Sequence, residues 1–149
     1  MAAVRTATVT WQGDLSSGRG SVSAGSSDTF LDLPVSWASR TEMPEGRTSP
    51  EELLAAAHAS CFAMAFSSNL AKAGTPPDHL HIEAAVTFDK LEAGWTVVSS
   101  ALTVIGRVPG STQEAFAAAA EAAKDGCPIS RALVGNVALS VDATLETDA

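Results

Sequence analysis

Hydrophobic and polar residues alternate through the first part of the chain. Every second side chain shares a face over residues 4–11, and Gly13 with Asp14 predicts a turn after this segment. A polar, glycine-rich segment at 18–25 and an alternating segment at 29–35 follow. We therefore expect an N-terminal antiparallel meander of three strands.

A long apolar helix is expected next. Ser49 fits the N-cap, Pro50 the first helical position, and Glu51 and Glu52 the negatively charged first turn. Gly74 provides a C-cap, and two prolines follow it. The nearly apolar run within this helix, residues 53–66, is too short to span a bilayer, so we expect no membrane association.

The second half of the sequence predicts two further strands, a helix and a last strand. The β-rich runs 79–91 and 95–108 flank a hairpin signal at 92–94. Residues 112–124 favour a helix, 129–133 a short helical turn and 136–145 an alternating strand. The order βββ-α-ββ-α-β indicates an α+β fold, with antiparallel β-sheets packed on a long central helix in a single domain over 1–149.

Composition narrows the classes of partner. Hydrophobic residues make up 46% of the chain and charged residues 17%, which excludes a disordered chain and favours a buried subunit interface. The net charge of -8 argues against binding to nucleic acid or to anionic membranes. The first residues contain no apolar leader segment, so we expect a cytoplasmic protein whose two cysteines are free thiols.

Candidate chemistry is concentrated on the long helix and at one helix break. Glu51, His58 and Cys61 fall on one stripe of the helix. Cys61 is compatible with a small buried hydrophobe as well as with a reactive thiol, and a lone helical histidine such as His58 is more often a satisfied core residue than a catalyst. Cys127 stands in a Gly-Cys-Pro break, where neighbouring amides favour a thiolate.

Metal binding is the main alternative to thiol chemistry at these residues. Cys61, Cys127, His58 and either His79 or His81 offer thiolate and imidazole ligands. The sequence has no C-x-x-C and no H-E-x-x-H, so nothing local builds a zinc site. It also lacks a nucleophile elbow, a Walker motif and a dinucleotide fingerprint, which argues against hydrolase and nucleotide-binding functions.

Two motifs in combination resemble the osmotically inducible protein C / organic hydroperoxide resistance (OsmC/Ohr) family. They are T-S-P-E-E-L-L-A-A-A-H-A-S-C-F at 48–62 and G-C-P-I-S at 126–130. The segments W-Q-G-D-L-S-S-G-R-G at 11–20 and F-D-K-L-E-A-G-W at 88–95 are similar to the OsmC branch. The resemblance implies a cytoplasmic, thiol-dependent peroxidase for organic hydroperoxides. It also implies an intertwined homodimer with active sites at the subunit interface.

The resemblance implies roles for individual residues. Cys61 matches the peroxidatic cysteine and Cys127 the resolving cysteine. Glu51 matches the family's glutamate. The family's arginine matches Arg40 in the OsmC branch and Arg19 in the Ohr branch. The sequence A-H-A-S-C at 57–61 is similar to the OsmC branch and therefore favours Arg40.

The chemistry of these residue types agrees with such a site. A guanidinium lowers the pKa of a nearby thiol, and a carboxylate in bidentate contact fixes its direction. A thiolate at Cys61 would give a sulfenic acid, which Cys127 would convert to a disulfide. An external dithiol, by resemblance a lipoyl-type protein or a small thiol, would reduce it, and no metal or organic cofactor is required. The alternative is a non-catalytic ligand-binding, sensor or metal-thiolate domain on the same fold.

Helix geometry adds a prediction about assembly. Ten residues separate Glu51 from Cys61, which is about 15 Å along a continuous helix, too far for one guanidinium to serve both within one chain. Two copies of the helix crossing antiparallel near Ala56 would bring Glu51 of one copy beside Cys61 of the other. We therefore expect an obligate homodimer with composite active sites.

Overall fold

The structure is a computed structural model that describes residues 1–147. The chain divides into two compact units, Met1–Leu53 and Leu54–Ala149. The α+β fold class is confirmed, with the strands in two small sheets. The expectation of a single domain over the whole chain stays a prediction.

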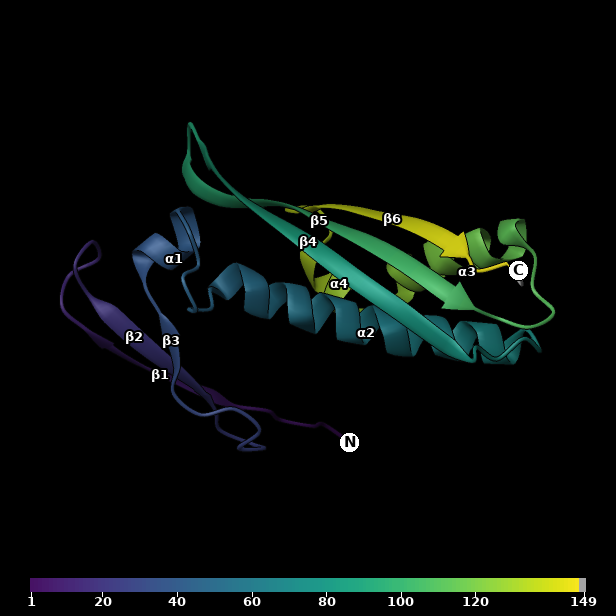
Figure 1. The fold of residues 1–149 in the computed structure, drawn as a ribbon, viewed down its shortest axis with the longest axis horizontal. Helices are drawn as coiled ribbons and strands as arrows, with labels where there is room; N and C mark the ends of the chain where they lie inside the picture. Colours follow the sequence, from purple (N-terminus) through teal and green to yellow (C-terminus); the bar gives the residue numbers. More distant parts are fainter. Residues whose placement is uncertain (148–149) are drawn as a thin grey trace. The chain divides into compact units, whose positions relative to one another are not determined.

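The first unit contains the expected three-stranded meander (Figure 1). Strands β1 (Ala7–Gln12), β2 (Arg19–Ala24) and β3 (Leu33–Val35) pair antiparallel in that order. Gly13, with a φ of 90°, starts the turn after β1, in a conformation that side chains disfavour. The three predicted strands are therefore confirmed, although each is shorter than its predicted segment.

A short helix, α1 (Trp37–Thr41), was not predicted from the sequence. Ser36 is its N-cap: the Ser36 hydroxyl accepts a hydrogen bond from the Ser39 amide, and the Ser39 hydroxyl donates back to the Ser36 carbonyl. This local capping arrangement forms a helix of five residues, too short for an apolar periodicity to be visible.

The long helix α2 (Pro50–Lys72) begins where the sequence predicts. The Ser49 hydroxyl accepts a hydrogen bond from the Glu52 amide at 3.1 Å, so Ser49 caps the helix as expected. Pro50 stands at the first helical position, where its missing N–H costs nothing.

In the second unit, β4 (His79–Leu91), β5 (Gly94–Arg107) and β6 (Ala138–Leu145) form one sheet in that order. Strands β4 and β5 make the expected antiparallel hairpin. The expectation of purely antiparallel sheets is wrong for the last strand, because β6 pairs parallel to β5. Helices α3 (Gln113–Gly126) and α4 (Pro128–Leu133) connect the two strands, and a helical crossover of this kind returns the chain in the same direction.

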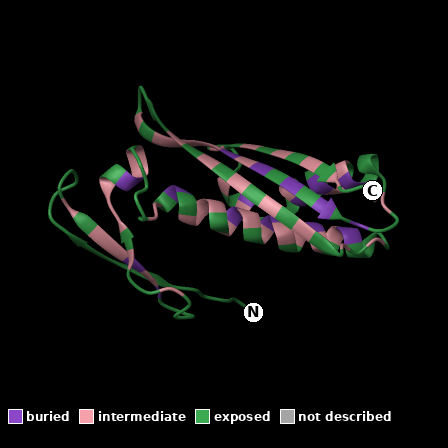
Figure 2. Ribbon diagram, in the orientation of Figure 1, coloured by how far each residue is buried: buried purple, intermediate pink, exposed green. Residues whose placement is uncertain are grey.

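The core of the second unit lies on one face of this sheet. Phe66 from α2 meets Phe62 with ring centroids 5.4 Å apart and Phe116 from α3 at 5.0 Å. These rings pack with Leu102 and Val104 from β5. Figure 2 shows buried positions recurring along α2 and β5, as expected where one face of each is covered.

Helix α2 is long and apolar enough, by length and composition, to cross a membrane, although its apolar run alone is not. The core helix of a globular protein meets the same criterion. Here Phe62, Phe66 and Leu70 on this helix are buried against the sheet and α3.

Candidate active site

An arginine and a glutamate form a close ion pair in the first unit. The Arg40 guanidinium donates from Nη2 to Oε1 of Glu51 at 2.8 Å, and from Nε to Oε1 and Oε2 at 3.0 and 3.2 Å. The Glu51 side chain is almost fully buried, whereas that of Arg40 is partly exposed. Glu51 therefore fixes the orientation of a guanidinium that solvent still reaches.

The segment from β3 to α2 positions this ion pair. Arg40 lies in α1, and its guanidinium carbon is 5.7 Å from the centroid of the Trp37 ring. The Ser39 hydroxyl donates to the Thr48 carbonyl at 3.0 Å, and the Thr48 amide donates to the Pro34 carbonyl at 2.9 Å. Helix α1 is thus held against the start of α2, where Glu51 occupies the first turn.

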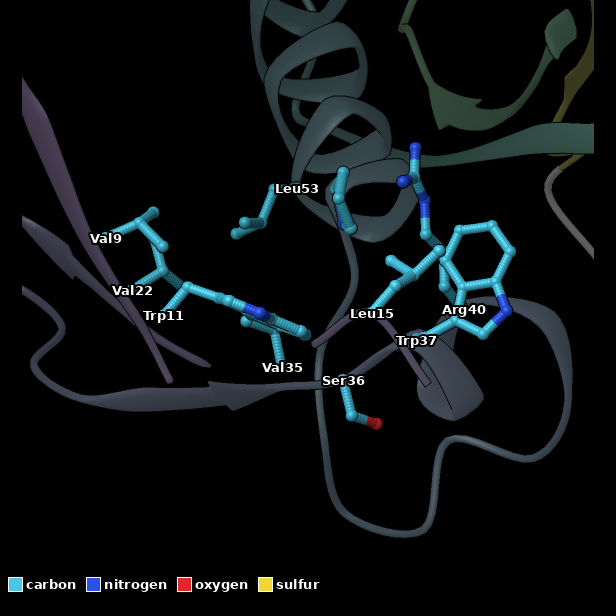
Figure 3. Close-up of a pocket in the computed structure, with 10 residues that line it drawn as sticks. Val9, Trp11, Leu15, Val22, Val35, Ser36, Trp37, Arg40 and Leu53 are labelled. Carbon is cyan, nitrogen blue, oxygen red and sulfur yellow. The ribbon is translucent and has the colours of Figure 1, made fainter. Parts of the chain in front are cut away.

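The same unit contains an apolar pocket of about 360 Å³ beside Arg40 (Figure 3). Its lining comes from the strands, from α1 and from the first turn of α2, and is almost entirely apolar apart from Ser36 and the arginine. The lining residues are Val9, Trp11, Leu15, Val22, Val35, Ser36, Trp37, Arg40, Pro50 and Leu53. Val9 and Leu15 are more than half exposed, so the pocket presents apolar surface around one charged group.

The second unit brings the two cysteines together. Cys61 lies on α2 and is partly buried, whereas Cys127, at the junction of α3 and α4, is fully buried. Both are free thiols, and they hydrogen-bond to each other. Two thiols far apart in sequence thus lie close enough to influence each other's ionisation.

Their surroundings shift the pKa values of the two thiols in opposite directions. Burial and the hydrogen bond to Cys127 raise the pKa of Cys61, and the Ile129 amide opposes this only in part. Burial also raises the pKa of Cys127, but hydrogen bonding from Cys61, Ser130 and Ile129 outweighs it, and the net effect lowers the pKa. In the isolated pair, Cys127 is therefore the thiol that ionises first, with Cys61 as its donor.

A buried histidine lies close to this pair. The ring of His58 on α2 contacts the Ser100 hydroxyl through Nδ1 at 2.6 Å and the Ser130 hydroxyl through Nε2 at 2.8 Å. Burial lowers the pKa of His58, so the ring is neutral near pH 7. Both ring nitrogens have hydrogen-bond partners, as expected for a satisfied core histidine.

The structure thus groups the predicted site residues into two pairs. Arg40 contacts Glu51, and Cys61 contacts Cys127. Arg19, the alternative arginine, is exposed on β2 opposite Gln12. Ser100 and Ser130 were not singled out from the sequence, although Ser130 belongs to the G-C-P-I-S motif. Within residues 1–147, no three His, Cys, Asp or Glu side chains cluster as metal ligands would.

The fold is found in a known family. The family model described as OsmC-like protein matches residues 43–142, and the chain belongs to this family. Among curated proteins, it is 39% identical over 129 residues to the protein named peroxiredoxin OsmC of Escherichia coli (strain K12). That match covers 87% of this chain and 89% of the relative, and it confirms the expected enzyme class, a peroxidase-type oxidoreductase.

Solved structures of the same family share the fold. The organic hydroperoxide resistance protein OhrB of Bacillus subtilis is 27% identical, with a TM-score of 0.66 over 95% of this chain and 98% of that chain. An organic hydroperoxide resistance protein OsmC from Legionella pneumophila is 22% identical, with a TM-score of 0.69 over 96% and 99% of the two chains. The resemblance seen in the sequence is therefore confirmed at the level of family and fold.

Proposed function

We propose that this protein reduces organic hydroperoxides to alcohols with Cys61 as the peroxidatic and Cys127 as the resolving cysteine, in defence against oxidative stress. The hydrogen bonding between the two thiols is the observation that carries this proposal. A disulfide needs its two sulfur atoms within bonding reach, and these two thiols are neighbours in the fold. Cys61 is the more exposed of the pair, as a thiol that meets a substrate must be.

The proposed reaction has two steps. The Cys61 thiolate attacks the distal oxygen of the hydroperoxide; the O–O bond breaks, Cys61 becomes a sulfenic acid, and the alkoxide takes a proton to give the alcohol. The Cys127 thiolate then attacks the sulfenic sulfur; the S–S bond forms, the S–O bond breaks, and the departing hydroxide leaves as water. An external dithiol reduces the disulfide, which suits a cytoplasmic enzyme.

Activation of Cys61 needs a cation that its own unit does not supply. Among the described residues of the Leu54–Ala149 unit, no cation is found among the groups that shift the Cys61 pKa. We assign this role to the Arg40 guanidinium of a second copy, held by that copy's Glu51. The spacing of Glu51 and Cys61 along α2 favours this composite site. The apolar pocket beside Arg40 would receive the organic part of the hydroperoxide.

Mass spectrometry tests the chemistry. One equivalent of an organic hydroperoxide should convert the two thiols of each chain to an intramolecular Cys61–Cys127 disulfide. Cys61→Ser should abolish turnover, whereas Cys127→Ser should allow one turnover and then accumulate sulfinic acid at Cys61. Ser140→Ala, exposed on β6 and away from α2 in the sequence, is the control and should keep full turnover. A Cys61–Cys61 link, or equal residual activity in the two cysteine variants, would contradict these roles.

Mixed subunits test the composite site. Glu51→Ala and Cys61→Ser homodimers should each be inactive, and subunit exchange should restore activity, because one site of each heterodimer keeps both wild-type residues. Arg40→Ala should raise the pKa of Cys61, read from the pH dependence of alkylation, whereas Arg19→Ala should not. A monomer by sedimentation, or the pKa effect at Arg19 instead, would overturn the assignment.

A further inference from the structure

The proposed reaction leaves the buried His58 without a role. His58 is fully buried, and so are its two partners, Ser100 on β5 and Ser130 on α4. A buried polar network loses its solvation, and a well-packed apolar side chain of similar volume would avoid that cost. The three residues come from three different elements, and the network leads toward one of the two thiols.

Ser130 connects the histidine to Cys127. Cys127 is the N-cap of α4 and Ser130 is the third residue of that helix, so the two lie within one helical turn. Hydrogen bonding from both the amide and the hydroxyl of Ser130 acts to lower the pKa of Cys127, against the burial that raises it. The hydroxyl of Ser130 is thus 2.8 Å from His58 Nε2 and close enough to Cys127 to act on its pKa.

The neutral imidazole gives the network a direction. One ring nitrogen carries the proton and the other accepts, because burial keeps His58 uncharged. Ser130 has one hydroxyl proton, and it reaches the sulfur only when the oxygen accepts from Nε2–H of His58. Nδ1 must then accept the hydroxyl proton of Ser100, which lies 2.6 Å away. In the opposite tautomer, Nε2 would accept the hydroxyl proton of Ser130. The Cys127 sulfur would then receive no hydrogen bond from that hydroxyl.

We propose that Ser100, His58 and Ser130 form a positioning chain that directs the Ser130 hydroxyl onto Cys127 and holds this cysteine as the thiolate for the resolving step. The identity of that step rests on the proposed function; the chain itself does not. In the step, the Cys127 thiolate supplies the electron pair of the S–S bond. The departing hydroxide takes up a proton equivalent to the one that Cys127 gave up. His58 acts through Ser130 and touches neither substrate nor reacting sulfur in this role.

The experiment measures the Cys127 thiolate in a Cys61→Ser background, which leaves a single thiol, by its ultraviolet absorbance as a function of pH. Ser130→Ala and His58→Leu should each lower the acid dissociation constant of Cys127 by about tenfold, the effect of one hydrogen bond to a charged group, and so lower the thiolate fraction. The double variant should lose no more than either single variant. His58→Gln, whose amide can donate where Nε2 did, should restore most of the thiolate. His81→Leu on β4 is the exposed control and should change nothing.

Each possible result either supports or overturns the proposed chain of Ser100, His58 and Ser130. An unchanged thiolate fraction in His58→Leu, additive losses in the double variant, or no rescue by His58→Gln would overturn the chain. Ser100→Ala removes a single hydroxyl and should give a partial loss, so it tests the chain even where His58→Leu does not fold. None of these titrations needs a peroxide. A failure of the proposed function would instead be seen as missing turnover in the wild type, with the titration results intact.

Discussion

Lowering the pH from 7 to 5 should destabilise the folded chain through His58. Its ring is fully buried, and burial lowers its pKa from the ordinary histidine value of 6.5. Below pH 6.5 the unfolded chain therefore binds a proton at this position that the folded chain refuses. Stability then rises with pH, so His58's contribution is complete above pH 6.5 and is lost as the pH falls below it.

The magnitude follows from this proton. Each pH unit below 6.5 costs at most about 1.4 kcal/mol while folded His58 stays neutral. Over the 1.5 units to pH 5 the loss is therefore at most about 2 kcal/mol per chain. That is a large share of the 5–15 kcal/mol by which typical domains are stable.

Urea unfolding between pH 5 and 8, at fixed protein concentration and followed by far-ultraviolet circular dichroism, measures this loss. His58→Gln should be less stable than the wild type at pH 8, and the difference should shrink by up to about 2 kcal/mol by pH 5. His81→Gln, at an exposed strand position, should run parallel to the wild type. A His58→Gln curve parallel to the wild type, or a wild type whose stability is flat between pH 7 and 5, would refute a neutral buried ring.

Two further predictions concern the ion pair and the core. Glu51→Gln removes the charge that holds the buried end of the Arg40 guanidinium, and urea unfolding should show a loss of about 1.5–3 kcal/mol; an unchanged midpoint would mean that solvent screens the pair. Phe66→Ala deletes a fully buried ring and should lower the free energy of unfolding by about 3–5 kcal/mol. Met64→Ala, at a side chain 73% exposed, should lower it by less than about 0.5 kcal/mol. Equal losses in the two variants would contradict the described orientation of α2.

Elements with strong local signals were predictable from the sequence. The start of α2 is set by a cap, a proline and an acidic first turn, all within four residues. Helix α1 has only the Ser36–Ser39 capping arrangement, a signal too short to stand out from a loop. The alternation over 136–145 predicted the strand β6, but alternation carries no information about direction. Only the intervening helices α3 and α4 indicate that the strand returns parallel.

The candidate site likewise has residues that sequence motifs predict and residues that only the fold brings together. Motif resemblance selected both cysteines, Arg40 and Glu51, and the structure places them in two contacting pairs. The roles assigned to them stay predictions. The partners of His58 lie 42 and 72 positions away on other elements, so only the fold brings them together. The sequence-based expectation that His58 is a satisfied core residue agrees with its geometry.

The complete burial of Cys127 has a consequence for how the proposed disulfide would be reopened. An incoming reductant reaches a sulfur only along the line of the bond it breaks, and the Cys127 sulfur has no exposed surface. Attack must therefore fall on Cys61, and Cys127 becomes the leaving group. Thiols of low pKa depart faster, so the hydrogen bonding from Ser130 and Ile129, which acts to lower the pKa of Cys127, would also speed its release and direct the mixed disulfide onto Cys61.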